Sequence, residues 1–377
     1  MKIARREFFA TGAAAAATAL PDITKARADF PWASNETYLN TATEHPLSVH
    51  SAAAMREYVN ALVNGPDSAR DKFENGQLMT AVKKMFAQLI NAKPSEIGFT
   101  PSTQTGENIV LEGLNVMAGG NVVTNDLHYG GSLVNYRERQ KAGLDARIVA
   151  HKDYVMDFRD LERVVDRKTK LIAIAIVSNV NGYVHEIRRI ADLAHAHGAY
   201  VYVDAIQAAG AVPIDVRAMG IDFLACSAYK WLMGGRFGYL YVREDLQDTV
   251  LKAKLFGGRS TPEGASRYEI STASHLGCVC QSQALAYIHS YGVERIRAHV
   301  RPLTERLRKE LPALGYPSIT PPNSESPIVS FAVKDPAAAK AKLQKAKVVV
   351  SMGSTMRVSP SIFNNMSDVE RLLAALA

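Results

Sequence analysis

The segment SAYKW at residues 227–231 decides the fold of this chain, together with the acidic residue Asp204. Lys230 follows an apolar run at residues 221–226, and Asp204 closes a second apolar run at residues 199–203. Runs of this length and composition predict buried strands. If the two strands are neighbours in a parallel sheet, the side chains that follow them lie at the edge where α/β proteins bind ligands. We therefore expect Asp204 and Lys230 to meet at one ligand-binding edge.

An acid and a lysine at such an edge fit the chemistry of one cofactor, pyridoxal 5′-phosphate. The lysine amine can form a Schiff base with the cofactor, and the carboxylate can hold the pyridine nitrogen protonated. Each residue alone is uninformative, because lysines after strands are usually solvated and acids at strand ends usually belong to caps or turns. The combination of Asp204 and Lys230 indicates an enzyme that uses pyridoxal phosphate.

The composition is that of a globular protein. Hydrophobic residues make up 47% of the chain and charged residues 21%. A length of 377 residues is enough for one large and one small domain. The net charge of +7 is spread along the chain and predicts no nucleic-acid partner. The three cysteines, Cys226, Cys278 and Cys280, are expected to be free thiols. His195 and His197 are two apart on a predicted helix and point to different faces, so no metal site is expected.

The N-terminus has the features of an export signal. Arg5 and Arg6 precede an alanine-rich apolar run that ends at Leu20, and Ala26 and Ala28 supply small residues for a cut after Ala28. This order resembles a twin-arginine signal covering residues 1–28. The apolar run is shorter than the roughly 20 residues of a membrane span, so no stable membrane anchor is expected. We expect the folded protein to reach the periplasm through the twin-arginine export machinery.

Two domains are predicted from the order of apolar and amphipathic segments. Residues 29–290 alternate strands with helices, including a helix at 187–197 that Gly198 terminates, and predict an α/β domain with a mainly parallel sheet. Residues 291–377 begin with a charged helix at 293–311 and predict a smaller domain. The strands expected in the large domain are residues 97–100, 122–124, 147–150, 171–177, 200–203, 223–226 and 239–242.

From about Tyr38 to Leu376 the chain resembles the class V aminotransferases. These are fold-type I pyridoxal phosphate enzymes, and they include cysteine desulfurases, isopenicillin N epimerase-like proteins and kynureninase. The resemblance rests on several separated motifs in the family's order. It implies a large domain with a mainly parallel mixed sheet and a smaller C-terminal α/β domain.

The resemblance also implies which residues bind the cofactor phosphate. The segment FTPSTQTGEN at residues 99–108 leads from a strand into a helix, where small and hydroxyl residues can face an anion. An ordinary helix cap would look the same. The family's pattern makes Thr103 and the amide of Gln104 phosphate donors, with Ser227 as a further donor.

Other positions correspond to the cofactor ring and to the substrate. His128 matches the residue that stacks on the pyridine ring, and Asp204 the residue that pairs with its nitrogen. Gln207 matches the residue that hydrogen-bonds the phenolic oxygen, and Asn179, in SNVNG at 178–182, lies near that oxygen and the substrate carboxylate. Arg357, in MRVSPS at 356–361, matches the arginine that binds the α-carboxylate through its planar fork.

A homodimer with shared active sites is implied by the segment RYEIST at residues 267–272. It resembles the family's Arg-Phe-Glu-x-Gly-Thr, whose threonine reaches the phosphate of the neighbouring subunit, and Thr272 stands at that position. Ser271 replaces the usual glycine, so the loop is expected to differ in detail.

The reaction is expected to begin with removal of the Cα proton of an amino acid or peptidyl amine by Lys230. Cysteine desulfuration is disfavoured because no cysteine lies between residues 328 and 357, and Tyr229 replaces the histidine of desulfurases. Transamination is the first expectation, a β-eliminating C–S lyase the second and an epimerase the third. A binding module without activity is disfavoured, since Lys230, Asp204 and Arg357 are all present. The substrate itself stays open, including whether it is a free amino acid or part of a peptide.

Overall fold

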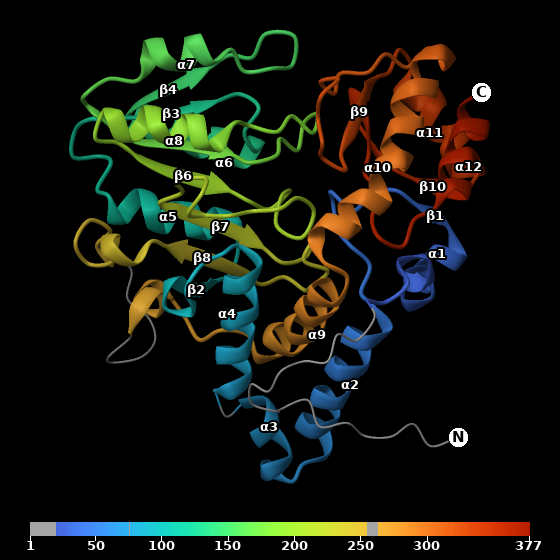
Figure 1. The fold of residues 1–377 in the computed structure, drawn as a ribbon, viewed down its shortest axis with the longest axis horizontal. Coiled ribbons are helices and arrows are strands. Elements are labelled where there is room, and N and C mark those ends of the chain that lie inside the picture. Colours follow the sequence, from blue (N-terminus) through green and yellow to red (C-terminus); the bar gives the residue numbers. More distant parts are fainter. Residues whose placement is uncertain (1–19, 75, 255–262) are drawn as a thin grey trace.

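The computed structural model describes residues 20–74, 76–254 and 263–377 (Figure 1). The predicted twin-arginine motif at Arg5 and Arg6 lies outside these residues. Within them, no helix is both long enough and apolar enough to cross a membrane.

A seven-stranded mixed sheet forms the centre of the larger domain, with strand order β2-β8-β7-β6-β5-β3-β4. The run from β7 to β4 is parallel, and β8 is antiparallel to both of its neighbours. This confirms the predicted α/β class, and every expected strand is present with ends within two residues of the prediction. The strands are β2 (Ile97–Thr100), β3 (Asn121–Asn125), β4 (Asp145–Val149), β5 (Thr169–Ala175), β6 (Tyr200–Asp204), β7 (Phe223–Ser227) and β8 (Gly238–Val242).

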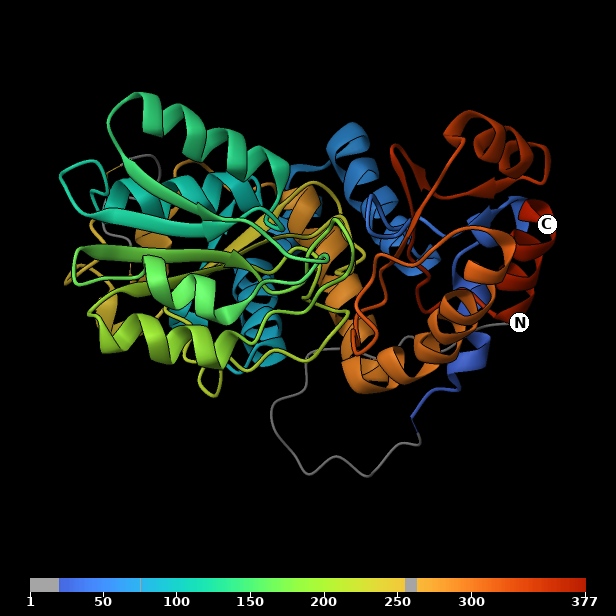
Figure 2. The same ribbon diagram turned by 90° about the horizontal axis from the view of Figure 1, so that it is seen from above.

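Helices cover both faces of this sheet, which explains why its strands are continuous apolar runs (Figure 2). Ile172 and Ile174 of β5 belong to the core on one face, while Leu171 and Ala173 belong to the core on the other. The helices packed on the first face include α4 (Gln77–Leu89) and α8 (Ile187–Ala196), and those on the second include α5 (Thr103–Gly113) and α6 (Gly130–Lys141). As predicted, a glycine ends α8, and Gly198 adopts a positive φ of 76°.

The start of α5 is held against the end of β7. Ser102 caps the helix by accepting a hydrogen bond from the backbone nitrogen of Thr105 at 3.1 Å. Gly106 allows the close approach, because a Cβ atom there would lie 2.7 Å from the Cβ of Ala225 on β7. The N-terminus of α5 is therefore placed beside the segment that carries Lys230.

Two long helices lead from the large domain into the small one. The small domain contains a three-stranded sheet of order β11-β12-β9, covered by helices (Figure 1). Its elements and the helices that lead to it are α9 (His275–Tyr291), α10 (Val293–Glu310), β9 (Val329–Ala332), α11 (Pro336–Lys345), β10 (Val348–Val349), β11 (Ser351–Met352), β12 (Thr355–Val358) and α12 (Met366–Leu376). The other helices are α1 (Trp32–Asn35), α2 (Val49–Asn64), α3 (Asp71–Glu74) and α7 (Phe158–Val164), besides short 3-10 turns.

The N-terminal segment does not stay with the large domain, to which residues 29–290 were assigned. The strand β1 (Thr37–Tyr38) pairs in parallel with β10, and Leu39 is buried in the core of the small domain. A strand of two residues has no periodicity that a sequence could show, so this pairing was not predicted.

Residues just before the predicted cut at Ala28 are packed into the fold. They form a 3-10 turn, η1 (Ile23–Asp29), in which Ala26 is fully buried. Arg27 donates hydrogen bonds to both carboxylate oxygens of Asp368, at 2.7 and 3.1 Å, and to the carbonyl of Phe363. A cut after Ala28 would remove these contacts with the small domain.

Candidate active site

Asp204 and Lys230 lie at the same edge of the sheet, as the apolar runs predicted. Asp204 ends β6, which is paired in parallel with β7, and Lys230 follows β7 by three residues. Both side chains are buried. Burial lowers the pKa of Lys230 to about 8, against the opposing effect of the Asp204 charge. Burial raises the pKa of Asp204, an effect that the neighbouring His128 reduces.

Thr103 and Ser227 join the start of α5 to the end of β7. The Ser227 backbone nitrogen donates to the Thr103 hydroxyl at 2.9 Å, and the Thr103 backbone nitrogen donates to the Ser227 hydroxyl at 2.8 Å. The side chain of Gln104 instead donates to the carbonyl of Gly131 at 3.1 Å. Two buried hydroxyls at the N-terminus of an 11-residue helix suit a phosphate group, because the helix end favours negative charge.

His128 presents an aromatic ring inside the site. Its Nδ1 atom accepts a hydrogen bond from the backbone nitrogen of Tyr129 at 2.7 Å. The Nε2 atom is buried and, among the described residues, has no hydrogen-bond partner. Burial lowers the pKa of His128, so a neutral imidazole is favoured. A neutral ring beside Asp204 is suited to stack on another aromatic ring.

Arg357 reaches from β12 of the small domain to a loop of the large domain. Its Nη1 atom donates to the backbone carbonyl of Asn179 at 2.9 Å, and its Nη2 atom donates to the hydroxyl of Thr43 at 2.8 Å. The Nε atom is buried without a partner among the described residues. The charge of Arg357 also lowers the pKa of Lys230, so the two side chains share one electrostatic environment. Thr43 was not predicted as a member of this site.

These groups fit pyridoxal phosphate part by part. The hydroxyls of Thr103 and Ser227 can bind the phosphate. The buried carboxylate of Asp204 can bind the ring nitrogen, and the buried amine of Lys230 can react with the aldehyde. The orphaned Nε2 of His128 and the orphaned Nε of Arg357 are polar atoms that a bound ligand could satisfy.

The family profile described as Aminotransferase class-V matches residues 38–372. The chain belongs to this family. Pyridoxal phosphate is accordingly its cofactor, and its fold is that of the fold-type I enzymes.

The similar proteins include aminotransferases and desulfurases by name. A probable cysteine desulfurase of Methanothermobacter thermautotrophicus is 28% identical over 326 residues, which cover 82% of this chain and 81% of the relative. The uncharacterized aminotransferase YcbU of Bacillus subtilis is 25% identical over 92% of this chain and 95% of its own length. The apo structure of a cysteine desulfurase from Thermococcus onnurineus superposes with a TM-score of 0.82 at 25% identity, covering 96% of this chain and 98% of that one.

Gln207 has hydrogen-bond partners within the chain, and Thr272 lies at the surface. The side chain of Gln207 accepts a hydrogen bond from the Trp231 indole at 2.8 Å and donates to the carbonyl of Ala42 at 3.0 Å. Gln207 thus ties Trp231 to the N-terminal segment. Thr272 is exposed, and no hydrogen bond or ion pair within residues 20–74, 76–254 and 263–377 connects it with the site above.

Glu107 is a member of the site that sequence reasoning missed. It is buried, accepts hydrogen bonds from Ser132 at 2.5 Å and Tyr136 at 2.6 Å, and lies 3.9 Å from the Nε2 of His128. Burial raises the pKa of Glu107, and its charge raises that of Asp204. The available signal was its position four residues after Thr103, which places both side chains on one face of α5.

The three cysteines and the two histidines of α8 and its end have the following surroundings. All three cysteines are free and buried. His195 contacts Asp222 at 2.8 Å, and His197 contacts the carbonyl of Leu193 at 2.9 Å. No group of three potential metal ligands occurs in the described part of the chain.

Proposed function

We propose that this class V enzyme transfers the amino group of an amino acid to a 2-oxo acid. The observation that carries the proposal is the buried amine of Lys230, with a pKa lowered to about 8, beside Asp204. A group with a pKa near the working pH can both accept and return a proton. Transamination needs both steps, and one base on one face of the cofactor can perform them.

The residues of the site divide the work among them. Pyridoxal phosphate, when bound, supplies an electron sink for the pair of electrons left at Cα. Asp204 keeps the proton on the ring nitrogen, and Lys230 takes the Cα proton. Arg357 holds the α-carboxylate by paired hydrogen bonds, which orients the Cα–H bond toward Lys230. The balanced reaction converts one amino acid and one 2-oxo acid into the other 2-oxo acid and the other amino acid.

Persulfide formation on a protein thiol does not suit this chain. A thiol must be accessible and ionised to take sulfur from a substrate. Cys226, Cys278 and Cys280 are all buried, and burial raises the pKa of each. The desulfurase names of the relatives therefore do not carry over in this respect.

A β-eliminating C–S lyase is the second candidate, and it requires no thiol on the protein. Tyr229 precedes Lys230, and burial raises the pKa of its phenol, which therefore stays protonated near neutral pH. A protonated phenol beside the base could protonate a departing sulfur.

Product analysis separates these reactions. The protein loaded with pyridoxal phosphate is incubated with a panel of amino acids, including cysteine and cystine, and with 2-oxoglutarate as acceptor. Transamination yields glutamate without ammonia, elimination yields ammonia and sulfide, and epimerisation yields the D-amino acid. Lys230→Ala is the control, which should abolish each product. Ammonia in equal amount to the oxo acid would contradict transamination.

The anchor role of Arg357 needs its own test. Arg357→Ala should raise KM strongly and lower kcat, because positioning is lost together with attraction. For peptides whose α-carboxylate is blocked, the substitution should leave KM and kcat unchanged. Unchanged KM and kcat for every substrate accepted would remove Arg357 from the site.

We also infer that the enzyme is exported folded to the periplasm. The support is the Arg5-Arg6 pair ahead of the apolar run. Replacing both arginines with lysine should retain the precursor in the cytoplasm, and mass spectrometry of the exported protein gives the cut site. Export of the double variant at the normal rate would reject the twin-arginine route.

A homodimer with shared sites is proposed from the match at Thr272. The Lys230→Ala and Thr272→Ala variants, each of which is inactive or weakly active alone, are unfolded, mixed and refolded together. If Thr272 serves the partner's site, hybrid dimers contain one intact site and activity returns. If Thr272 acts within its own subunit, no site is restored and the mixture stays inactive.

A further inference from the structure

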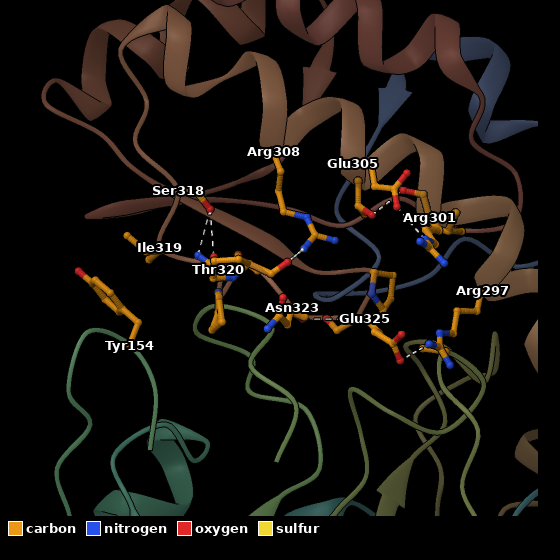
Figure 3. A pocket seen from close by; sticks show the side chains of 18 of the residues that line it. Tyr154, Arg297, Arg301, Glu305, Arg308, Ser318, Ile319, Thr320, Asn323 and Glu325 are labelled. Atoms are coloured by element: carbon orange, nitrogen blue, oxygen red, sulfur yellow. Dashed lines mark hydrogen bonds and ion pairs between the residues drawn. The ribbon is translucent and has the colours of Figure 1, made fainter. Parts of the chain in front are cut away.

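A cavity of about 830 Å³ lies between the two domains, and none of the residues assigned to the cofactor or the substrate lines it (Figure 3). Its volume is in the range of roughly 300–1,000 Å³ typical of small-molecule sites. The small domain contributes α10 and the segment 318–326, and the large domain contributes residues 153–155, Ala211 and Trp231. Ligand sites commonly occupy such boundaries.

Four cationic side chains of α10 line this interdomain cavity, namely Arg297, Arg301, Arg308 and Lys309. Two of them are neutralised locally, because Arg297 pairs with Glu325 and Arg301 pairs with Glu305. Neither Arg308 nor Lys309 pairs with a carboxylate in the described part of the chain. Because Asp153 also lines the cavity, its four cationic side chains face three carboxylates, which leaves a formal excess of one positive charge.

Arg308 is the most informative of these cations. It extends from α10 toward the segment 318–325 (Figure 3), and its Nη1 atom donates to the carbonyl of Pro322 at 3.1 Å. Its Nε atom is buried without a partner in the described residues. Burial lowers the pKa of Arg308, an effect that Glu305 opposes. A guanidinium in this state would gain a charge-assisted hydrogen bond from an anion.

Polar and aromatic groups complete the lining. Ser318, Thr320 and Asn323 lie on the segment below α10, and Tyr154 projects from the large domain (Figure 3). Asp153 and Tyr154 both have positive φ values, 48° and 63°, which are uncommon for residues with side chains. This tight turn holds the phenol ring at the cavity wall.

We propose that this cavity binds a small organic anion. Its carboxylate or phosphate group pairs with Arg308, and its remaining part lies against the Tyr154 side of the cavity. The ligand contacts both domains and stabilises their present arrangement.

The cavity is connected to the Arg357 side of the active site by one loop. The side chain of Asn181 donates to the carbonyls of Tyr154 and Ile319, at 2.7 and 3.3 Å, and both acceptors belong to cavity-lining residues. Two residues earlier, the carbonyl of Asn179 accepts from Arg357. A bound anion is thus expected to change the affinity for the amino acid, a part of the inference that rests on the proposed function of Arg357.

Calorimetric titration of the holoenzyme tests the binding itself. The probes are citrate and inorganic phosphate, which separate carboxylate from phosphate recognition, and bound pyridoxal phosphate keeps both from the phosphate-binding residues. Arg308→Gln should weaken binding at least tenfold. Arg306→Gln is the matched control, because Arg306 lies on the same helix and pairs with Glu310 and Glu370 outside the cavity. Thermal unfolding of each variant shows that it is folded.

Each result of the titrations either supports or overturns the proposed anion site. Saturable binding that weakens in Arg308→Gln and persists in Arg306→Gln and Arg357→Ala supports the site. No saturable binding of either probe, equal weakening in the two α10 variants, or loss only in Arg357→Ala overturns it. For the coupling, the citrate Kd is measured with and without saturating amino acid. Equal values overturn the coupling, since linkage requires a reciprocal change.

Discussion

Replacing Arg27 with methionine should destabilise the folded protein, because it strips a buried carboxylate of its charged partner. Arg27 donates to both oxygens of Asp368, whose side chain is fully buried, while 28% of the Arg27 side chain is exposed. The same guanidinium also donates to the carbonyls of Phe363 and Ala33. Methionine fills similar space but makes none of these four hydrogen bonds.

The size of the stability loss depends on the hydrogen bonds that Asp368 retains. Removing one partner of a buried ion pair costs about 3–5 kcal/mol. Asp368 retains hydrogen bonds from the Asn364 side chain at 3.0 Å and the Asn365 backbone at 3.1 Å, which places the loss at the lower end of that range. A loss of about 3 kcal/mol corresponds to a fall in Tm of about 5 °C in a chain of this size.

Denaturant unfolding and thermal scans measure this loss, with Lys25→Met as the control. Lys25 is an exposed cation of the same turn, so its replacement should leave stability unchanged. A protein starting at residue 29 should be destabilised at least as much as Arg27→Met, because it also lacks the buried Ala26. If the protein starting at residue 29 is as stable as one starting at residue 20, the reasoning is refuted. A cut after Ala28 would then carry no structural cost.

Three further outcomes are expected at the active site. Asp204→Asn should retain pyridoxal phosphate but lower kcat roughly 10- to 150-fold, corresponding to a charge-assisted hydrogen bond of about 1.5–3 kcal/mol; near wild-type turnover would contradict its role. The rate at which the apoprotein captures pyridoxal phosphate should rise with pH around a midpoint of about 8, because the neutral Lys230 amine is the reactive form and burial lowers its pKa to that value; a midpoint near 10 would argue against desolvation. Glu107→Gln should lower the pKa of Asp204, because the charge of Glu107 raises it, and titration of the apoprotein followed by NMR can measure the change; an unchanged Asp204 pKa would contradict this coupling.

The strands of the large domain could be predicted from the sequence because each is marked by a pattern within a few consecutive residues. Each buried strand is a short apolar run bounded by polar residues, as at 199–203 before Asp204, and strands covered on both faces keep that pattern. The apolar runs predicted where Lys230 lies. The resemblance then singled out Thr103, Ser227 and Arg357, because these lie within motifs of fixed spacing.

What could not be predicted depends on contacts between distant segments. The pairing of β1 with β10 joins residues about 310 positions apart, and neither strand has more than two residues. The partners of Gln207 come from Ala42 and Trp231, so its hydrogen bonds are visible only in the folded chain. Glu107 looks like a solvated helix residue until α6 brings Ser132 and Tyr136 against it.

The rate at which a reagent labels the three buried thiols measures how often the surrounding structure opens. Cys226 lies in β7, an interior strand of the seven-stranded sheet, so a thiol reagent reaches it only when the sheet itself is disrupted. Cys278 and Cys280 lie on α9, which packs against α2 and α4, so detachment of that helix alone exposes them. Labelling at α9 ahead of β7 would show that the helical layer opens before the sheet, and equal rates would show a single cooperative unit.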